Sequence, residues 1–310
     1  MRVTYTTLLL VFCFITAYSQ ENIKPVLPEI VTQFPNVRDI AISPKGDEVL
    51  FTAQNVLGTL SAIVEVKKQG NVWGPPQIAS FSGQYFDLEP YFGKDGLTLY
   101  FASTRPNKNT SEHSKNFDIW YVTRQNVNGK WTEPINMGSP INTEHGEFYS
   151  SIADNGNFYF TRDNPSLKRK DDIYVSELKK GSYTEPKPLP DTINSEGYEY
   201  NAFIAPDESY LIFGAYNRND GLGSGDLYIS YKAKSGWSNA QNMGSSINSD
   251  KMDYCPFVKN NVLYFTSKRD HTNTEFDTPL SVTELLEEFN TYENGQSRLY
   301  KTNLETHLKE

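Results

Sequence analysis

Cysteine is almost absent from this chain: Cys13 and Cys255 are the only two in 310 residues. Cys13 falls within an apolar leader, so Cys255 alone would remain after processing, and one thiol cannot form an internal disulfide. The fold must therefore depend on burial and strand pairing. Cys255 lies in the apolar run Tyr254–Val258, where we expect a small buried hydrophobic residue.

Basic residues are outnumbered, with 29 Lys and Arg against 38 Asp and Glu, which gives a formal net charge of −9. Nucleic acids and anionic lipid surfaces require a basic partner surface. We therefore expect no nucleic-acid partner. The charge balance favours a neutral glycan, a protein or a cation as the ligand.

Motifs for cofactor or nucleophile chemistry are also missing. The four histidines are scattered, without the spacing of a zinc site, and no glycine-rich phosphate loop is present. Residues Gly221–Asp226 resemble a nucleophile elbow only superficially, because the spacing fails and no helix is expected to follow. We expect no catalytic nucleophile, no metal ligand set and no cofactor on these grounds.

No apolar run is long enough to span a bilayer, which needs about 20 residues. The longest, Leu8–Ile15, follows Arg2 and precedes the small-residue pattern Ala17–Ser19. This arrangement predicts a secretory signal peptide over residues 1–19. We expect residues 20–310 to form a single domain, monomeric, without a transmembrane segment, and either periplasmic or secreted.

Aromatic residues are abundant, with 20 Tyr and 18 Phe, and they favour pleated structure. A repeat of about 50 to 60 residues runs through the chain, with anchors at Trp73, Trp131, Tyr183 and Trp237. Five hairpin patterns, each ending on Phe, recur with this period. They are Ile40–Phe51, Pro90–Phe101, Ser150–Phe160, Ala202–Phe213 and Pro256–Phe265.

Each hairpin pattern is followed by a third strand and, at the anchors, by a shorter fourth strand, except in the last block. Repeated units of four antiparallel strands are typical of propeller blades. We predict an all-β, five-bladed β-propeller that the N-terminal strand Glu29–Phe34 closes by pairing with the last block. The alternative is a sixth blade built from residues 20–37 and 270–296. A capping box at Ser281–Glu284 predicts a short helical insertion near residues 280–290.

One set of charged residues should lie on a single face of the propeller. Within each blade the strands are antiparallel, so the first strand starts on the face where the second strand ends. The set contains four acids and four arginines: Asp87, Glu147, Glu199, Asp253, Arg105, Arg162, Arg218 and Arg269. One interpretation is buried Arg–carboxylate pairs that hold the blades together. The other is a ligand site, in which the acids bind calcium or bind sugar hydroxyls beside tyrosines. These are Tyr149, Tyr198, Tyr200 and Tyr254.

Three segments carry a resemblance to a known family: Lys94–Arg105, Phe117–Val122 and Gly129–Thr143. They closely resemble the WD-like propeller repeats of the TolB type, in the version found in exported proteins of Bacteroidetes. The resemblance extends over residues 38–304. It implies a binding scaffold in complexes of the cell envelope, although propellers of this sort also occur in hydrolases and lyases.

Two functional hypotheses follow. The leading one is an exported, non-enzymatic propeller scaffold that binds an envelope protein or a glycan through its loop-bearing face. The alternative is a glycoside hydrolase or lyase acting on extracellular polysaccharide, with two of the four acids at the channel mouth as acid and base. Glycoside cleavage needs two carboxyls about 5 to 9.5 Å apart, one of them held protonated. If the arginines pair with all four acids, this version of the enzyme fails.

Overall fold

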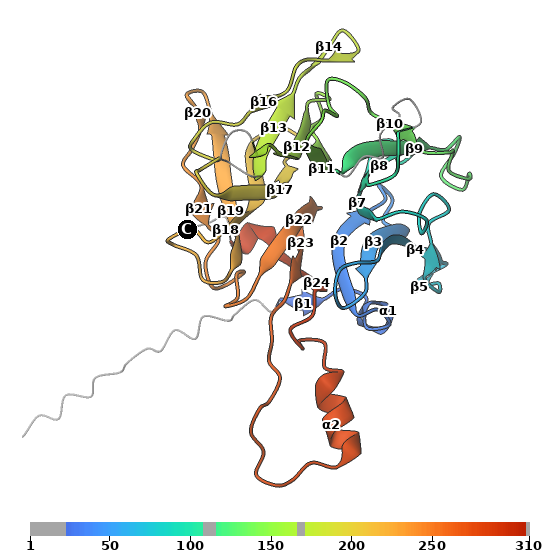
Figure 1. The fold of residues 1–310 in the computed structure, drawn as a ribbon, viewed down its shortest axis with the longest axis vertical. Helices are drawn as coiled ribbons and strands as arrows, with labels where there is room; N and C mark the ends of the chain where they lie inside the picture. The colour runs from blue at the N-terminus through green and yellow to red at the C-terminus, as the bar shows by residue number, and fades with distance from the viewer. Residues whose placement is uncertain (1–22, 108–115, 166–170, 308–310) are drawn as a thin grey trace, which may run out of the picture.

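Five antiparallel sheets surround a central axis in the computed structural model, which describes residues 23–107, 116–165 and 171–307 (Figure 1). The predicted signal peptide, residues 1–19, lies outside the described residues. Each sheet is one blade, and its innermost strand faces the axis. The predicted five-bladed β-propeller is confirmed.

The blades share one order, in which strands follow one another outward from the axis. Blade 1 contains β2 (Asn36–Ile42), β3 (Glu48–Gln54), β4 (Ser61–Gln69) and β6 (Gln77–Ile78). Blade 2 contains β7 (Asp87–Phe92), β8 (Thr98–Ser103), β9 (Asp118–Thr123) and β10 (Ile135–Asn136). Blade 3 contains β11 (Gly146–Ile152), β12 (Phe158–Asp163), β13 (Asp171–Ser176) and β16 (Lys187–Pro188).

Blade 4 contains β17 (Tyr198–Ile204), β18 (Tyr210–Tyr216), β19 (Gly225–Ala233) and β21 (Gln241–Asn242). Blade 5 contains β22 (Asp253–Lys259), β23 (Val262–Ser267), β24 (Arg298–Asn303) and β1 (Lys24–Pro25). Three anchors lie in short strands at the far ends of the third strands rather than in the fourth strands themselves. These short strands are β5 (Val72–Trp73), β15 (Ser182–Tyr183), which pairs with β14 (Leu178–Lys179), and β20 (Gly236–Trp237).

The ring is closed by an N-terminal strand, but not by the predicted segment. Lys24 pairs with Lys301, and Pro25 pairs with Tyr300, so β1 supplies the fourth strand of blade 5. The predicted closing segment Glu29–Phe34 is wrong, because its first residues belong to the helix α1 (Pro28–Val31). Proline at the start of a helix needs no backbone partner and has a preset φ, which favours this turn over a strand.

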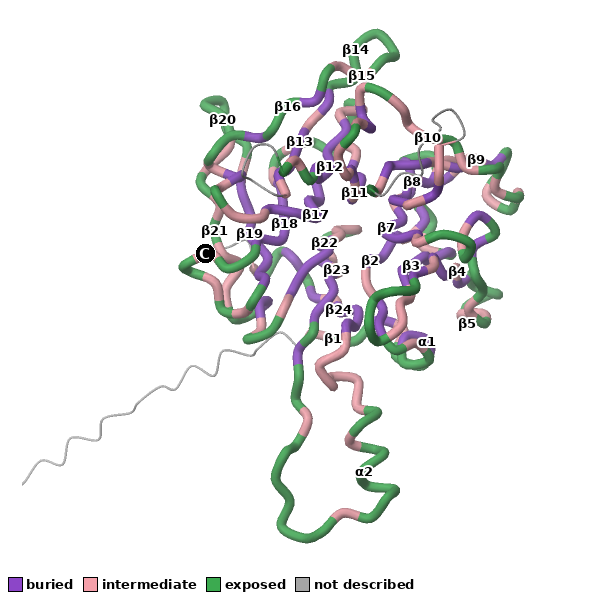
Figure 2. The backbone as a smooth tube through the Cα atoms, viewed as in Figure 1, coloured by how far each residue is buried: buried purple, intermediate pink, exposed green. Residues whose placement is uncertain are grey.

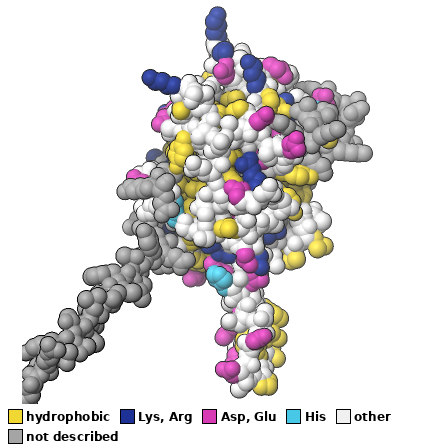
Figure 3. Space-filling view, turned by 90° about the vertical axis from the view of Figure 1, so that its left-hand side faces the viewer, with side chains coloured by type: hydrophobic (Ala, Val, Ile, Leu, Met, Phe, Trp, Pro, Cys, Tyr) yellow, Lys and Arg dark blue, Asp and Glu magenta, His cyan; other side chains and the backbone are white. Residues whose placement is uncertain are grey.

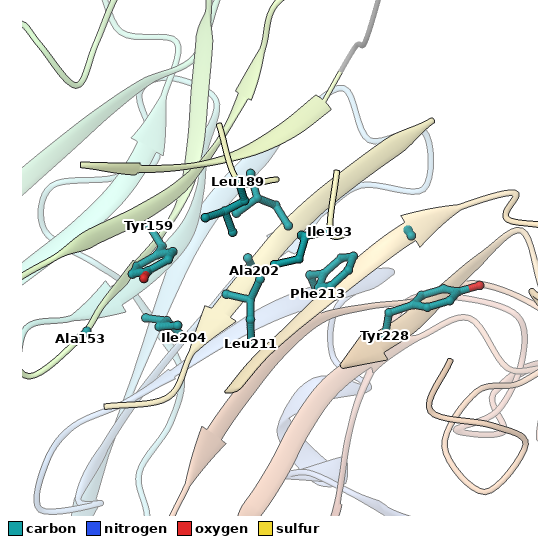
Figure 4. Close-up of a cluster of buried hydrophobic side chains, with 11 residues drawn as sticks. Ala153, Tyr159, Leu189, Ile193, Ala202, Ile204, Leu211, Phe213 and Tyr228 are labelled. Carbon is teal, nitrogen blue, oxygen red and sulfur yellow. The ribbon is translucent and has the colours of Figure 1, made fainter. Parts of the chain in front are cut away.

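The core lies between neighbouring blades rather than at the axis. The five phenylalanines that end the predicted hairpins are fully buried: Phe51, Phe101, Phe160, Phe213 and Phe265. Figure 4 shows one inter-blade cluster, in which Phe213 and Leu211 of blade 4 pack near Tyr159 of blade 3. Buried positions follow the strands, whereas the loops and one projecting arm are exposed (Figure 2). The helix of that arm, α2 (Val282–Phe289), lies where the capping box predicted it.

Candidate active site

The predicted acids and arginines form four buried ion pairs. The structure joins each arginine to the acid of its own blade and to a backbone carbonyl of the connection before that blade. All four acids have no exposed surface. The pairs are Arg105–Asp87 at 2.7 Å, Arg162–Glu147 at 2.8 Å, Arg218–Glu199 at 2.8 Å and Arg269–Asp253 at 3.1 Å.

We call these eight residues the ion-pair ring. Its acids also accept hydrogen bonds from the connections, for example from the backbone N–H and the hydroxyl of Ser195 to Glu199. Burial raises the pKa of Glu147 to about 7, while hydrogen bonds from Thr143 and the charge of Arg162 oppose the rise. None of the four acids is among the described residues that line the axial cavity. The acid and base predicted from the ring are therefore wrong, and its role in binding stays a prediction.

A second repeated feature lies two residues further along the same strands. Each innermost strand has a β-bulge, and the residue at the bulge has a positive φ: Asp39 (52°), Glu89 (60°), Tyr149 (56°), Asn201 (53°) and Cys255 (52°). Non-glycine residues rarely adopt this backbone conformation, and such strain concentrates at functional sites. The five bulge residues come from five different blades.

Four of the bulge residues meet around Arg38 in a buried polar group, which we call the axial cluster. Arg38 Nε donates to Asp39 Oδ1 at 2.8 Å, and its Nη2 donates to Glu89 Oε1 at 2.6 Å. Asn201 Nδ2 also donates to Glu89 Oε1, at 3.0 Å. Cys255 Sγ donates to Asp39 Oδ1 at 2.8 Å. The cluster thus joins blades 1, 2, 4 and 5 at the axis.

Glu89 has the most altered chemistry in the cluster. Burial raises its pKa from about 4.5 to about 8; the charge of Asp39 also raises the pKa, and the charge of Arg38 lowers it. Its Oε2 is buried and has no hydrogen-bond partner among the described residues. Because Oε1 already accepts two hydrogen bonds, the proton of the neutral acid belongs on Oε2. Burial likewise raises the pKa of the Cys255 thiol well above its usual range, so this thiol is a poor nucleophile.

A cavity of about 520 Å³ lies over the axial cluster. This volume is within the range of small-molecule sites. Six aromatic side chains contribute to its wall: Phe117, Phe148, Tyr198, Tyr200, Tyr216 and Tyr254. Arg38, Glu89, Asn201 and Asp171 are the polar residues that line it. The cavity therefore combines an aromatic wall with a few placed polar groups.

The residue before the bulge lines this cavity in every blade. These residues are Arg38, Leu88, Phe148, Tyr200 and Tyr254. Of the four tyrosines predicted to lie beside a bound sugar, Tyr198, Tyr200 and Tyr254 line the cavity. Tyr200 has a buried hydroxyl without a partner among the described residues. Tyr149 packs beneath it and donates to the carbonyl of Pro256 at 2.8 Å.

The donor atoms of Asp39, Glu89 and Cys255 lie within 4.8 Å of one another, which is close enough to share a metal ion. However, the guanidinium of Arg38 donates to all three, with Nη2 lying 3.3 Å from the sulfur of Cys255. A positive group therefore already balances these donors. Calcium would also need six to eight oxygen ligands, so the arrangement favours Arg38 over a divalent ion at this position.

Sequence reasoning missed Arg38, Asp39, Glu89, Asn201 and Cys255 because it followed residue types that recur. The bulge positions carry five different residue types, so no repeat reveals them. One signal was available: in blades 2 to 5 the bulge residue follows a ring acid by two positions, as Glu89 follows Asp87. Blade 1 has Val37 at the ring position, so even that signal would not have found Asp39.

Comparison with known proteins gives matches at the level of structure only. No protein-family model matches the chain, and no curated protein matches its sequence. The solved structures that match include an α-L-arabinofuranosidase from Lactobacillus brevis. It has a TM-score of 0.51 and 14% identity, and the match covers 87% of this chain and 93% of that protein.

Two further arabinofuranosidases have a similar fold. The catalytic domain of a GH62 enzyme from Coprinopsis cinerea matches with a TM-score of 0.53 and 11% identity, over 87% of this chain and 90% of that domain. An enzyme from Podospora anserina, in complex with cellotriose, matches with a TM-score of 0.50 and 11% identity, over 86% and 90% of the two chains. At these identities the likeness shows the fold.

The comparison also bears on the two hypotheses drawn from the sequence. The leading hypothesis of a non-enzymatic scaffold is corrected, because the three structures just described are glycoside hydrolases that match over 86 to 87% of this chain, and they favour the enzyme alternative. From the resemblance to TolB-type repeats, the propeller fold is confirmed, whereas the WD-like repeat type and the Bacteroidetes version stay predictions. Among the described residues, no helix has the length and apolar character needed to cross a membrane. These matches make this chain similar in fold to known arabinofuranosidases.

Proposed function

We propose that this protein is a glycoside hydrolase that cleaves a glycan in the axial cavity, with Glu89 as the general acid. One observation carries the proposal: Glu89 is a buried carboxyl that lines an aromatic cavity, burial raises its pKa to about 8, and its Oε2 has no hydrogen-bond partner among the described residues. A glycosidic oxygen must gain a proton as its bond to the sugar breaks. A carboxylic acid with a pKa near the working pH is suited to supply it.

The axial cluster accounts for both the proton and its position. Arg38 and Asn201 hold Oε1 of Glu89 at 2.6 and 3.0 Å and leave Oε2 to carry the proton. Burial is the main cause of the raised pKa of Glu89, and the charge of Asp39 beside it adds to the rise, which favours the neutral acid. Asp39 itself is only 1% exposed, and both its oxygens accept hydrogen bonds, so it sets the state of Glu89 rather than attacking the substrate.

Hydrolysis needs a second carboxyl to activate water or to bind the sugar covalently. Asp171, at the start of β13 in blade 3, lines the same cavity as Glu89 of blade 2. The two carboxyls therefore approach a ligand in the cavity from different blades. We assign Asp171 the role of the base.

A neutral glycan fits the cavity better than an acidic one. With Glu89 protonated, the charges of Arg38 and Asp39 cancel. Sugar rings present C–H groups that pack on aromatic faces, which the six aromatic side chains supply. The hydroxyl of Tyr200, which has no partner in the described part of the chain, can bond to a sugar hydroxyl. The similar arabinofuranosidases support a carbohydrate substrate. The predicted signal peptide would place the reaction in the periplasm or outside the cell.

The test is to incubate the purified protein with a panel of neutral polysaccharides and aryl glycosides and to measure released sugar. We expect hydrolysis of at least one member. Glu89→Gln, which has the shape of the protonated acid, should reduce the rate by about 10²- to 10⁴-fold, the usual contribution of a general acid. The control Glu144→Gln changes an exposed glutamate of the loop-bearing face and should leave the rate unchanged. Full activity of Glu89→Gln would disprove the assignment.

A further inference from the structure

The arm, residues 270–295, is a second feature that the proposed catalysis does not use. It connects β23 to β24 in blade 5 and projects away from the blades (Figure 1). Its helix α2 is stabilised locally at both ends. Ser281 and Glu284 form a reciprocal capping box, and Asn290 Nδ2 donates to the carbonyl of Leu286 at 2.6 Å. The helix is therefore preformed without contact from the propeller.

The base of the arm is fixed to blade 5. Asp270 and Asn294 form an isolated β-bridge, and the backbone N–H of His271 donates to the carbonyl of Glu293 at 2.8 Å. Tyr292 donates its hydroxyl to the carbonyl of Leu299 in β24 at 2.7 Å. These contacts hold the two ends of the arm together and set its direction. The position of α2 away from the body is thus built into the fold.

The apolar face of α2 is uncovered. Val282, Leu285, Leu286 and Phe289 are 74%, 38%, 52% and 58% exposed, and no residue of the helix is buried. The spacing of i, i+3, i+4 and i+7 places all four on one side of the helix. Figure 3 shows hydrophobic side chains along one edge of the arm and acidic side chains along the other. A stripe of this kind on a preformed helix is what helix-in-groove partners recognise.

The charge of the arm limits what can cover this stripe. The arm has seven acidic residues and no Lys or Arg: Asp270, Glu275, Asp277, Glu284, Glu287, Glu288 and Glu293. Anionic lipid would repel it. A second copy of this chain, with a formal net charge of −9, also offers poor complementarity. A partner surface that combines an apolar groove with flanking Lys and Arg would bury the apolar face of the helix and pair with its acidic side chains.

We propose that the arm is a docking element, which inserts the apolar face of α2 into a groove of a partner protein whose rim is basic. The four apolar side chains fill the groove, and the acids of α2 pair with the rim. The propeller body would then be held beside that partner while the axial cavity, none of whose lining residues belongs to the arm, stays accessible. This inference does not depend on the reaction in the cavity.

The test begins with p-benzoylphenylalanine in place of Leu286 in the full chain, with the same residue in place of Val72 as the control. Val72 is 71% exposed in β5 of blade 1 and does not belong to the arm. After irradiation in extracts of cells that produce the protein, we expect one discrete adduct from position 286 and none from position 72. The adduct is identified by mass, and its partner is purified.

Direct binding of the purified partner to the intact chain then tests whether the apolar face and the acidic residues of α2 make the contact. Leu285→Ser combined with Phe289→Ser should weaken the affinity at least tenfold. Neutralising the helix with Glu284→Gln, Glu287→Gln and Glu288→Gln, or raising the salt concentration, should weaken it severalfold. The thermal unfolding midpoint should change little, since none of these side chains is buried. An adduct with the mass of two chains, flotation with anionic vesicles, no adduct at position 286, or a salt-independent affinity would each overturn the proposal.

Discussion

The acids of the ion-pair ring and the bulge residues of the axial cluster lie only two positions apart on the same strands, yet the two groups are built in opposite ways. The ring repeats one arrangement, an acid paired with an arginine, in blades 2 to 5. The cluster uses a different residue at each bulge. An ion pair that holds blades together recurs from blade to blade, here in four of the five, whereas a site on the axis is formed once and needs each group once. Repetition therefore marks the scaffold here, and variation marks the site.

Blade 1 connects the two regions. It has Val37 at the ring position, where the other blades have an acid, and Val37 is fully buried. The same strand supplies Arg38 and Asp39 to the axial cluster. Among the described residues, the one arginine that lines the cavity therefore comes from the blade without an ion pair in the ring.

The largest expected effect comes from a matched pair of substitutions, Glu89→Gln and Glu199→Gln. With a pKa of about 8, Glu89 is mostly in its neutral form at pH 7, so glutamine should preserve the free energy of unfolding while hydrolysis falls about 10²- to 10⁴-fold. Glu199 is a charged partner of Arg218, so glutamine there should lower stability instead. Urea unfolding and initial rates measured on both variants check this. Equal losses of stability in the two variants would mean that the axial cluster stabilises the fold as the ion-pair ring does, and the distinction between the two groups would fail.

Complete removal of a ring acid should have the next largest effect. Asp253→Ala leaves Arg269 without its charged partner at a site where the arginine side chain is only 10% exposed, and it also removes the acceptor for Ser249. Breaking a buried pair in this way costs about 3 to 5 kcal/mol. The urea midpoint measures the loss. Adding Arg269→Met should recover part of it, and a double variant no more stable than Asp253→Ala would argue against a coupled pair.

The pH dependence of activity and of stability should further distinguish the axial cluster from the ion-pair ring. Above about pH 8 Glu89 loses its proton, so kcat/KM should fall about tenfold per pH unit. Stability should behave differently. Between about pH 4.5 and pH 8 the unfolded carboxyl has lost its proton while the folded one keeps it, so the free energy of unfolding should fall as pH rises and then level off. Glu89→Gln should remove this component of both profiles, and a wild-type rate that is flat to pH 10 would contradict the role of Glu89.

The sequence predicted the repeated parts of this molecule and missed the unrepeated ones. Periodic turns and strand-final phenylalanines such as Phe101 were enough to count five blades, because every blade must bury the same face. Antiparallel geometry then placed Arg105 beside Asp87. The closing strand was misplaced, since Pro28 starts a helix where an extended segment was expected. Glu89 was overlooked because a bulge, which has no fixed sequence signature, turns its side chain to the axis.

The smallest effect is expected where an ion pair has the length of a ring pair but not its burial. Lys94 Nζ and Asp154 Oδ1 lie 2.8 Å apart, the same distance as in Arg162–Glu147, but their side chains are 77% and 53% exposed. Water and salt screen such a pair, so Asp154→Asn should change the free energy of unfolding by less than about 1 kcal/mol. Urea unfolding at low and at high salt measures this difference. A loss of stability comparable with that of Asp253→Ala would mean that the ring pairs stabilise the propeller through ion pairing alone, and that their burial is not what makes them strong.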